Sequence, residues 1–257
     1  MTDQNTKNNP DKPDNLDKQT RQHDLTGQNA ENHAAFTLYG YYRSSTSFRV
    51  RMALAYKNIA YEYISVNLLA KEHQSTEFKA IHPQGLVPAL AHDGHVLTQS
   101  LAILEYLDDV CAAPETLLVW GDAARKAKIR ALAQIIACDI HPMNNLSVWK
   151  GYLGGVLGVT DDQSTAWYAH WITQGLAAYE AMMDQTAAFS CGAALSLADI
   201  CLLPQLYNAR RFGVDLDHFT SILRVEKNML ALDAVRVSLP ENQSDAALGL
   251  NPIYEIA

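Results

Sequence analysis

The order of strand and helix patterns between residues 36 and 69 constrains the fold of this chain most. Residues 36–42, FTLYGYY, are rich in aromatic residues, which favours a strand. Residues 47–58, SFRVRMALAYKN, have helical spacing, and residues 61–69, YEYISVNLL, predict a second strand. A strand, a helix and a further strand of these lengths predict a βαβ unit.

A second group of elements follows in residues 86–110. Residues 86–99 predict two short strands joined through Asp93-Gly94, which is the strongest hairpin signal in the chain. Residues 100–110 then predict an amphipathic helix, which we expect Ser100 to cap. The complete order, β-α-β followed by β-β-α, is that of a thioredoxin-like fold.

The remainder of the chain shows convincing patterns for helices only. The first helical stretch contains Pro142, which is placed to kink or end it, and long helices are expected over residues 164–185 and 196–212. Ser196 and Asp199 stand three apart before an apolar run, as in a capping box with Asp in place of Glu.

The change of pattern predicts an α/β plus all-α chain with two domains. We expect a thioredoxin-like N-terminal domain over residues 36–112 and an all-helical C-terminal domain over residues 121–257. Residues 1–35 contain no aromatic residue and are rich in Asn, Asp, Gln and Lys. Such a segment buries too little apolar surface to offset its ordering entropy, so we predict that it is disordered.

The charge of the chain bears on its partners. Of the formal net charge of −8, residues 1–35 carry −2 and the remainder carries −6. An acidic body without a basic block argues against nucleic acid or an anionic membrane as the main partner. No apolar run reaches the length of about 18 residues that spanning a bilayer requires.

The cysteines and histidines indicate the compartment and the metal content. Four widely spaced cysteines form no CxxC pair, which favours buried structural thiols in a reducing compartment over a disulfide framework. We therefore expect a cytoplasmic protein. The nine histidines never fall into a ligand spacing with Cys or Asp, so no metal site is predicted.

Ser44, Ser45, Thr46 and Ser47 stand together at the start of the first predicted helix, where a single cap would suffice. A helix start presents unpaired backbone N–H groups and the positive end of the helix dipole, which suits an anion. Four capping hydroxyls without another role are the alternative.

Several separated motifs together resemble those of zeta-class glutathione transferases. That class has a Ser-Ser-Cys, an aromatic residue, Arg-Val-Arg and an apolar helix, which here stand as SSTSFRVRMAL. HPQGLVPAL, LTQSLAILEYLDD, CDIHPMNNLSV and SLADICLLPQLYNARRFGVDL also resemble that class at matching intervals. The likeness covers roughly residues 36–235 and implies a glutathione transferase fold, glutathione as cofactor and a homodimer.

The resemblance gives the hydroxyls a role. Ser44 matches the family serine that contacts the glutathione sulfur, Ser45 is its neighbour, and Thr46 replaces a cysteine usual in animal members. A dipole contribution of up to about 2 kcal/mol and a charge-assisted hydrogen bond of about 1.5–3 kcal/mol favour the thiolate. Together they bring a thiol pKa of about 8.5 to near 6 or 7. Ser44 is the preferred donor and Thr46 its rival.

Further glutathione contacts follow from the same resemblance. The bond between Val87 and Pro88 is expected to be cis, so that the Val87 backbone pairs with the peptide-like cysteine of glutathione. Gln99 and Ser100 are expected to hold the γ-glutamyl carboxylate. The remaining expected contacts are His73 at the glycine end, and His141 and Asn145 from the helical half.

Substrate carboxylates need cations, and Arg43 stands immediately before the hydroxyls. Members of the resembled class use an arginine of the stretch NARRF, where Arg211 matches best. We expect Arg210 to lie on a solvated helix face. Some relatives that act on maleylpyruvate carry arginines where this chain has Leu146 and Ser147, which favours maleylacetoacetate.

The implied activity is glutathione-dependent cis–trans isomerisation of maleylacetoacetate to fumarylacetoacetate, a step of tyrosine and phenylalanine breakdown. The thiolate adds to the double bond conjugated to the ketone, rotation follows, and expulsion of the thiolate leaves the trans isomer. The alternatives are a maleylpyruvate isomerase, a transferase with conjugating or dehalogenating activity, and a regulatory binding module without catalysis.

Overall fold

The computed structural model describes residues 35–246 and 252–254. The extension of residues 1–35, which we predict to be disordered, lies outside the described residues except for Ala35. The boundaries of the domains at residues 36–112 and 121–257 stay a prediction.

A four-stranded mixed sheet forms the N-terminal half, in the order β2-β1-β3-β4. β1 pairs with β2 in parallel, and β3 pairs antiparallel with β1 and β4. The strands are β1 (Phe36–Gly40), β2 (Tyr61–Ser65), β3 (Ala89–His92) and β4 (His95–Thr98). The predicted βαβ unit and hairpin are therefore confirmed.

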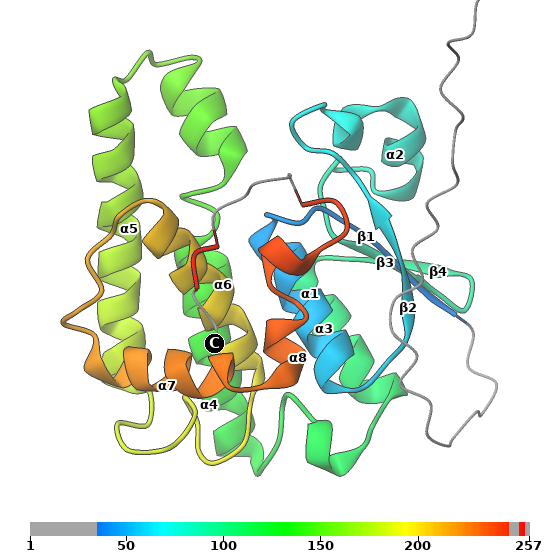
Figure 1. Cartoon of the computed structure of the whole chain (residues 1–257), viewed down its shortest axis with the longest axis vertical. Coiled ribbons are helices and arrows are strands. Elements are labelled where there is room, and N and C mark those ends of the chain that lie inside the picture. The colour runs from blue at the N-terminus through cyan, green and yellow to red at the C-terminus, as the bar shows by residue number, and fades with distance from the viewer. Residues whose placement is uncertain (1–34, 247–251, 255–257) are drawn as a thin grey trace, which may run out of the picture. The chain divides into compact units, whose positions relative to one another are not determined.

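Three α-helices accompany this sheet. Figure 1 shows α1 and α3 between the sheet and the C-terminal helices, whereas α2 lies above the sheet in this view. The helices and turns are α1 (Ser45–Tyr56), η1 (Glu72–Gln74), α2 (Thr76–Ile81), α3 (Ser100–Val110) and η2 (Pro114–Thr116).

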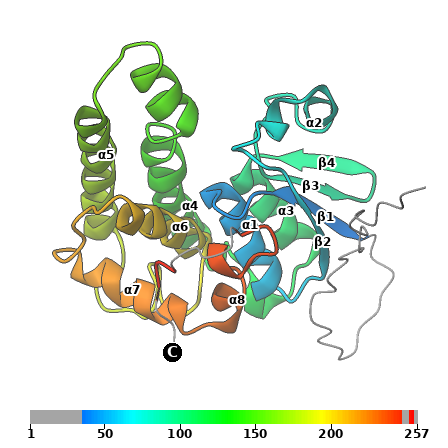
Figure 2. The ribbon, with the colours of Figure 1, turned by 45° about the horizontal axis from the view of Figure 1, so that its top comes forward.

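Helices make up the C-terminal half. Figure 2 shows α6 close to α1, and α5 projecting from the compact part of this half. The elements are α4 (Ala123–Gln134), the π-helices η3 (Ile135–Ile140) and η4 (Ser147–Gly154), α5 (Asp161–Met182), α6 (Leu197–Arg211), α7 (Thr220–Leu230), α8 (Asp233–Arg236) and η5 (Pro240–Asn242).

One continuous apolar core joins the two halves. Leu38 of β1, Leu54 of α1 and Leu107 of α3 are fully buried, and so are Ile129 of α4 and Leu203 of α6. Burial of each such side chain contributes about 1.5–3 kcal/mol relative to exposure. The first helix of the sheet half is thus held against α6, which fixes the start of α1 relative to the helical half.

The expected break at Pro142 is confirmed, but the structure around it differs from a regular helix. α4 continues without interruption into η3, the chain turns at residues 141–146, and η4 follows. Short π-helical segments within α-helices are frequent at functional sites. Here the wide turn of η3 leads directly into His141.

The start of α3 corrects the expected cap. Gln99, not Ser100, occupies the N-cap position, with a φ of 67°, and its side chain makes no capping hydrogen bond. Ser100 is the first helical residue, and its Oγ accepts a hydrogen bond of 3.2 Å from Arg49 Nη1. The capping prediction is wrong because the buried guanidinium of Arg49 takes the serine oxygen as its acceptor.

The described residues correct one expectation about the thiols. All four cysteines are free; Cys191 and Cys201 are buried and Cys111 is half-buried, but Cys138 is exposed. Cys138 is therefore not a buried structural thiol, because η3 presents it to solvent. No three or more metal-binding side chains gather anywhere in residues 35–246 and 252–254. Within those residues, no helix is both long enough and apolar enough to cross a bilayer.

Asp199 begins α6 in the way that the capping pattern predicts. Its fully buried carboxylate accepts hydrogen bonds from Ser190 N–H at 2.8 Å, Ser196 N–H at 2.8 Å and the Ser196 hydroxyl at 2.6 Å. Burial raises the pKa of Asp199 above its usual value, although these hydrogen bonds oppose the shift. The carboxylate organises the turn that precedes the helix.

Replacing Asp199 by alanine is expected to lower the free energy of unfolding by about 3 kcal/mol, because three buried donors lose their acceptor. Thermal and urea unfolding measure the loss. The control is Asp122→Ala, which removes the exposed N-cap of α4 with its 2.8 Å bond from Arg125 N–H. That variant is expected to lose only about 1 kcal/mol. Equal losses in the two variants would contradict this account of Asp199.

Candidate active site

The hydroxyl turn, residues 44–47, connects β1 to α1. Ser44 is the N-cap of α1, and its Oγ accepts a hydrogen bond of 3.2 Å from Ser47 N–H. Ser44 and Thr46 are half-buried, whereas Ser45 and Ser47 are buried. The capping role of Ser44 is thus present, and it leaves the hydroxyl proton of Ser44 for another acceptor.

The hydrogen bonds of the turn fix the direction of its protons. Thr46 Oγ1 lies 3.0 Å from the Val87 carbonyl oxygen, which only accepts, so the single Thr46 proton is used there. Thr46 Oγ1 also lies 2.9 Å from Ser44 Oγ. In that pair Ser44 must therefore be the donor. Rotation of the Ser44 hydroxyl releases its proton towards a new acceptor, whereas the Thr46 proton already bonds the Val87 carbonyl.

The turn that precedes β3 lies against the hydroxyl turn. The Val87-Pro88 peptide bond is cis, as expected. The carbonyl of Val87 is held by Thr46 across 41 positions of sequence. The structure therefore brings Ser44, Thr46 and the Val87 backbone to one place.

The helical half contributes His141 to this place. His141 Nδ1 lies 3.4 Å from Ser45 Oγ. Burial of the imidazole, and then the charge of Arg49, lower the pKa of His141 to about 3. The ring is therefore neutral at physiological pH, and it meets the hydroxyl turn as a neutral hydrogen-bonding group.

The start of α3 presents a second polar group. Ser100 is buried, and because its Oγ accepts from Arg49, its own proton remains available for a ligand. Gln99 is exposed and its Nε2 donates to Gln84 Oε1 at 2.9 Å. Arg49 is only 2% exposed, and its Nε and Nη2 have no hydrogen-bond partner among the described residues. The guanidinium therefore places beside Ser100 a positive charge that no carboxylate of the described residues pairs, which favours binding of an anion there.

For two predicted residues, His73 and Asn145, the structure gives only indirect evidence of a place at the site. The backbone of His73 packs on Gly85, where a Cβ would lie 2.7 Å from the His73 carbonyl oxygen, so its loop borders the turn before Val87. His73 Nδ1 is buried and has no hydrogen-bond partner within residues 35–246 and 252–254. Asn145 Oδ1 accepts from Ser147 N–H and the Ser147 hydroxyl, both at 3.0 Å. The structure thus joins Asn145 to its own turn rather than to the hydroxyl turn.

Both candidate substrate cations influence the same buried phenol, that of Tyr207. Burial and the neighbouring Glu241 raise the pKa of Tyr207, and the guanidinium groups of Arg211 and Arg43 lower it. Arg43 is half-buried over the ring of Tyr42, with 5.2 Å to the ring centroid. Arg43 and Arg211 come from different halves of the chain and both lie within electrostatic reach of Tyr207.

Arg210 is exposed on its helix face, as expected, but it is also paired. Its guanidinium bonds both carboxylate oxygens of the buried Glu226. Tyr254 also donates to Glu226, at 2.7 Å. Arg211 is exposed and bonds Asn208 Oδ1 only weakly, at 3.4 Å. Because Arg210 is paired with Glu226, Arg211 is the arginine of the two that is available to a ligand.

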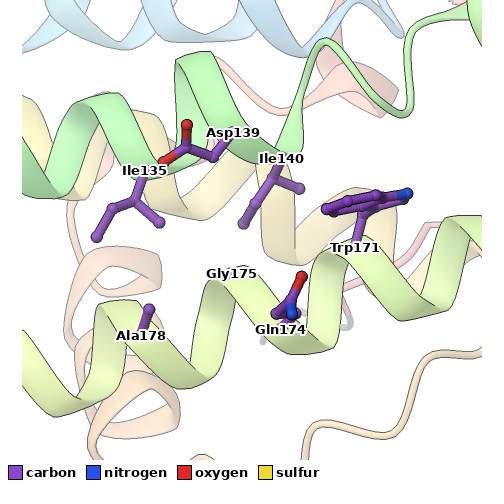
Figure 3. A pocket seen from close by; sticks show the side chains of 7 residues that line it. All are labelled: Ile135, Asp139, Ile140, Trp171, Gln174, Gly175 and Ala178. Atoms are coloured by element: carbon purple, nitrogen blue, oxygen red, sulfur yellow. The ribbon is translucent and has the colours of Figure 1, made fainter.

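A shallow groove of about 210 Å³ lies elsewhere, between η3 and α5 (Figure 3). Figure 3 shows Asp139 and Trp171 on opposite elements of this groove. Its lining residues are Ile135, Asp139, Ile140, Trp171, Gln174, Gly175 and Ala178. None of them is among the predicted site residues.

Sequence reasoning missed the contributions of Arg49 and Tyr207. Arg49 belongs to the matched Arg-Val-Arg motif, but no local pattern indicates that its guanidinium reaches Ser100 on α3. Tyr207 lies in a buried apolar helix, where a tyrosine is ordinary. Only the packing of α1, α3 and α6 brings these residues to the site.

Comparison with known proteins extends this description. A family model described as "Glutathione S-transferase, N-terminal domain" matches residues 34–109. A maleylacetoacetate isomerase of Pseudomonas aeruginosa is 44% identical over 212 residues, which are 81% of this chain and 97% of that protein.

Solved structures agree with this likeness. A holo maleylpyruvate isomerase, described as a bacterial zeta-class glutathione S-transferase, is similar with a TM-score of 0.79 and 42% identity, over 82% of this chain and 100% of that one. A maleylacetoacetate isomerase of Anaeromyxobacter dehalogenans, with dicarboxyethyl glutathione and citrate in its active site, has a TM-score of 0.74 and 40% identity, over 85% and 96% of the two chains.

A thioredoxin-like sheet half followed by a helical half is the glutathione transferase fold, so the predicted fold class is confirmed. With 44% identity to a relative that it covers almost completely, the chain belongs to the zeta-class glutathione transferase and maleylacetoacetate isomerase family.

Proposed function

We propose that this chain is a glutathione-dependent cis–trans isomerase that converts maleylacetoacetate to fumarylacetoacetate in tyrosine and phenylalanine breakdown. The observation that carries the proposal is the hydroxyl turn at the start of α1, in which Ser44 donates to Thr46 and can rotate its proton towards a bound sulfur. Relatives that isomerise maleylacetoacetate and maleylpyruvate are similarly close, at 44% and 42% identity.

The residues at the site fit glutathione. The predicted contacts are hydroxyls, amides, imidazoles and backbone groups, with no carboxylate among them, which suits a ligand with a thiolate and two carboxylates. The unpartnered Nε and Nη2 of the buried Arg49 add a positive charge beside Ser100. The γ-glutamyl carboxylate of glutathione would supply the missing counter-charge at this helix start.

Each group of this chain has a defined task in the proposal. Glutathione, when bound, supplies a thiolate that adds reversibly to the maleyl double bond, so that the bond can rotate. Ser44 donates its proton to the sulfur and, with the dipole of α1, holds it ionised. Val87 pairs with the peptide backbone, and Gln99 and Ser100 hold the γ-glutamyl end. His73, Ser45, Thr46, His141 and Asn145 complete the proposed glutathione contacts.

Arg43 and Arg211 bind the carboxylates of the substrate in this proposal. Arg43 directly precedes the hydroxyl turn, and Arg211 lies within electrostatic reach of the same tyrosine, Tyr207, which supports the role. The dicarboxyethyl glutathione and citrate in the relative's active site are polycarboxylates of the expected kind. No group of the chain is required to act as a strong base.

Maleylpyruvate is the second candidate substrate, because the relative with the TM-score of 0.79 is a maleylpyruvate isomerase. The experiment compares kcat/KM for the two maleyl substrates at saturating glutathione, followed by loss of absorbance. We expect maleylacetoacetate to be preferred, since Leu146 and Ser147 offer no cation. Equal or faster turnover of maleylpyruvate would contradict this choice of substrate.

The assembly and location belong to the same proposal. Resemblance to the family supports a cytoplasmic homodimer. The apolar residues Leu118 and Val119 lie between the two predicted domains and are 0% and 8% exposed. They therefore pack within the chain and lend no support to a dimer. Light scattering of the purified protein measures the assembly, and a monomer mass would contradict this part of the proposal.

A further inference from the structure

The segment that follows α8 crosses back over the sheet half and contacts the connection between β1 and the hydroxyl turn. We call residues 238–246 the C-terminal strap. Its Asp245 uses one carboxylate oxygen, Oδ2, to accept three hydrogen bonds. The donors are Tyr42 N–H at 3.0 Å, the Tyr63 hydroxyl at 3.2 Å and the Ser65 hydroxyl at 2.9 Å.

The opposite side of the same connection is held by Arg51. This fully buried guanidinium donates to the carbonyl oxygens of Tyr41 and Tyr42, at 3.4 and 3.0 Å. It also donates twice to the carbonyl oxygen of Ser238, at 3.2 and 3.1 Å. The peptide groups of Tyr41 and Tyr42 therefore lie between a cation of α1 and the carboxylate of the strap.

The connection needs these partners because it belongs to no regular element. β1 ends at Gly40 and α1 begins at Ser45, so the Tyr42 N–H is outside the sheet ladder and the helix. A buried N–H without a partner is costly, and Tyr42 is only 4% exposed. Asp245 supplies the acceptor two residues before Ser44 and one residue before Arg43.

We propose that Asp245 is a positioning residue for the active site, which holds the Tyr42 peptide so that Ser44 and Arg43 face the bound ligands. The proposal rests on the proposed function. Asp245 acts through the backbone and need not touch glutathione or substrate. A misplacement of about 1 Å in such a group can cost about 100-fold in rate.

The chain offers a matched control for the test. Tyr63 and Ser65 donate to the same oxygen from β2, whereas Tyr42 donates to it from the connection. The double variant Tyr63→Phe with Ser65→Ala removes two hydrogen bonds of the strap but keeps the acceptor for Tyr42 N–H. It separates loosening of the strap from loosening of the turn.

The experiment compares the full-length wild-type protein, Asp245→Ala, Asp245→Asn and the double variant. Ultraviolet absorbance of the thiolate gives the ionised fraction of bound glutathione at pH 7, calorimetry gives the Kd of glutathione, and thermal unfolding reports folding. For Asp245→Ala we expect kcat to fall about 10-fold or more and the thiolate fraction to fall. We expect its Kd for glutathione to change by less than about 3-fold, since the other contacts remain.

The sign of the thiolate change separates two explanations. Loss of a nearby negative charge, by itself, would favour the thiolate and raise its fraction. Displacement of Ser44 from the sulfur would instead lower the thiolate fraction. Asp245→Asn keeps a weaker, neutral acceptor, so its thiolate fraction is expected between those of wild type and Asp245→Ala. The double variant is expected to keep the wild-type fraction and kcat within about 2-fold, even where its melting temperature falls.

An unchanged or raised thiolate fraction in a folded Asp245→Ala variant would overturn the inference, as would an equal fall in the double variant. Were Asp245→Ala not to fold, Asp245→Asn decides: a reduced fraction supports the inference and an unreduced one overturns it. Absence of glutathione binding by the wild-type protein would instead be a failure of the proposed function.

Discussion

Replacing Ser44 by alanine is expected to lower turnover about 10- to 100-fold, which corresponds to roughly 1.4–2.7 kcal/mol of activation free energy. The Ser44 proton can leave Thr46 Oγ1 and turn towards sulfur, whereas the Thr46 proton is donated to the Val87 carbonyl. Without that donor the bound thiol ionises less readily, so the pH at which activity is half-maximal should rise. Steady-state rates between pH 6 and 9 measure both effects.

Two further variants make the Ser44 result specific. Thr160→Ala removes a hydroxyl N-cap with the same 3.2 Å bond to a backbone N–H, but on α5. It is expected to cost about 1 kcal/mol of stability and no activity. Thr46→Val removes the rival hydroxyl. A large loss in Thr46→Val beside an unchanged rate in Ser44→Ala would transfer the role of donor to Thr46.

Replacing Arg211 by alanine is expected to lower kcat/KM about 10- to 100-fold, because a charge-assisted bond of about 1.5–3 kcal/mol to a substrate carboxylate is lost. The structure favours Arg211 over its neighbour, since Arg210 is paired with the buried Glu226. Initial rates at varied substrate and saturating glutathione measure the effect.

The controls for Arg211 separate charge from geometry and from general effects. Arg211→Lys keeps the charge but loses the planar fork, so it should restore part of the activity. Arg130→Ala removes an arginine whose exposed ion pair with Glu105 lies away from the site, and it should leave kcat/KM unchanged. A folded Arg211→Ala variant with wild-type kcat/KM would remove Arg211 from the substrate site.

The sheet half was predictable because its signals are local. The Asp93-Gly94 turn joins β3 and β4, and aromatic residues mark β1 and β2. The position of the hydroxyl turn at the start of α1 also followed from the local sequence. Such signals are complete within a few residues, so no knowledge of packing is needed to read them.

The residues that were not predicted depend on contacts between distant segments. Asp245 reaches Tyr42 across 203 positions, and Arg49 reaches Ser100 across 51. The wide turns of η3 and η4 have no periodic pattern of their own, so a regular helix was expected there. The prediction that Ser100 caps α3 is wrong for the same reason, because its hydroxyl oxygen accepts a hydrogen bond from a buried arginine of another helix.

The most direct test of the proposed mechanism is turnover of maleylacetoacetate by the purified chain after exhaustive removal of glutathione, followed by its restoration. If the reaction requires an ionised glutathione sulfur at the first turn of α1, the rate should fall to the uncatalysed background and return with added glutathione. S-methylglutathione, which has no free thiol, should not restore it. An undiminished rate in the glutathione-free protein would contradict the account.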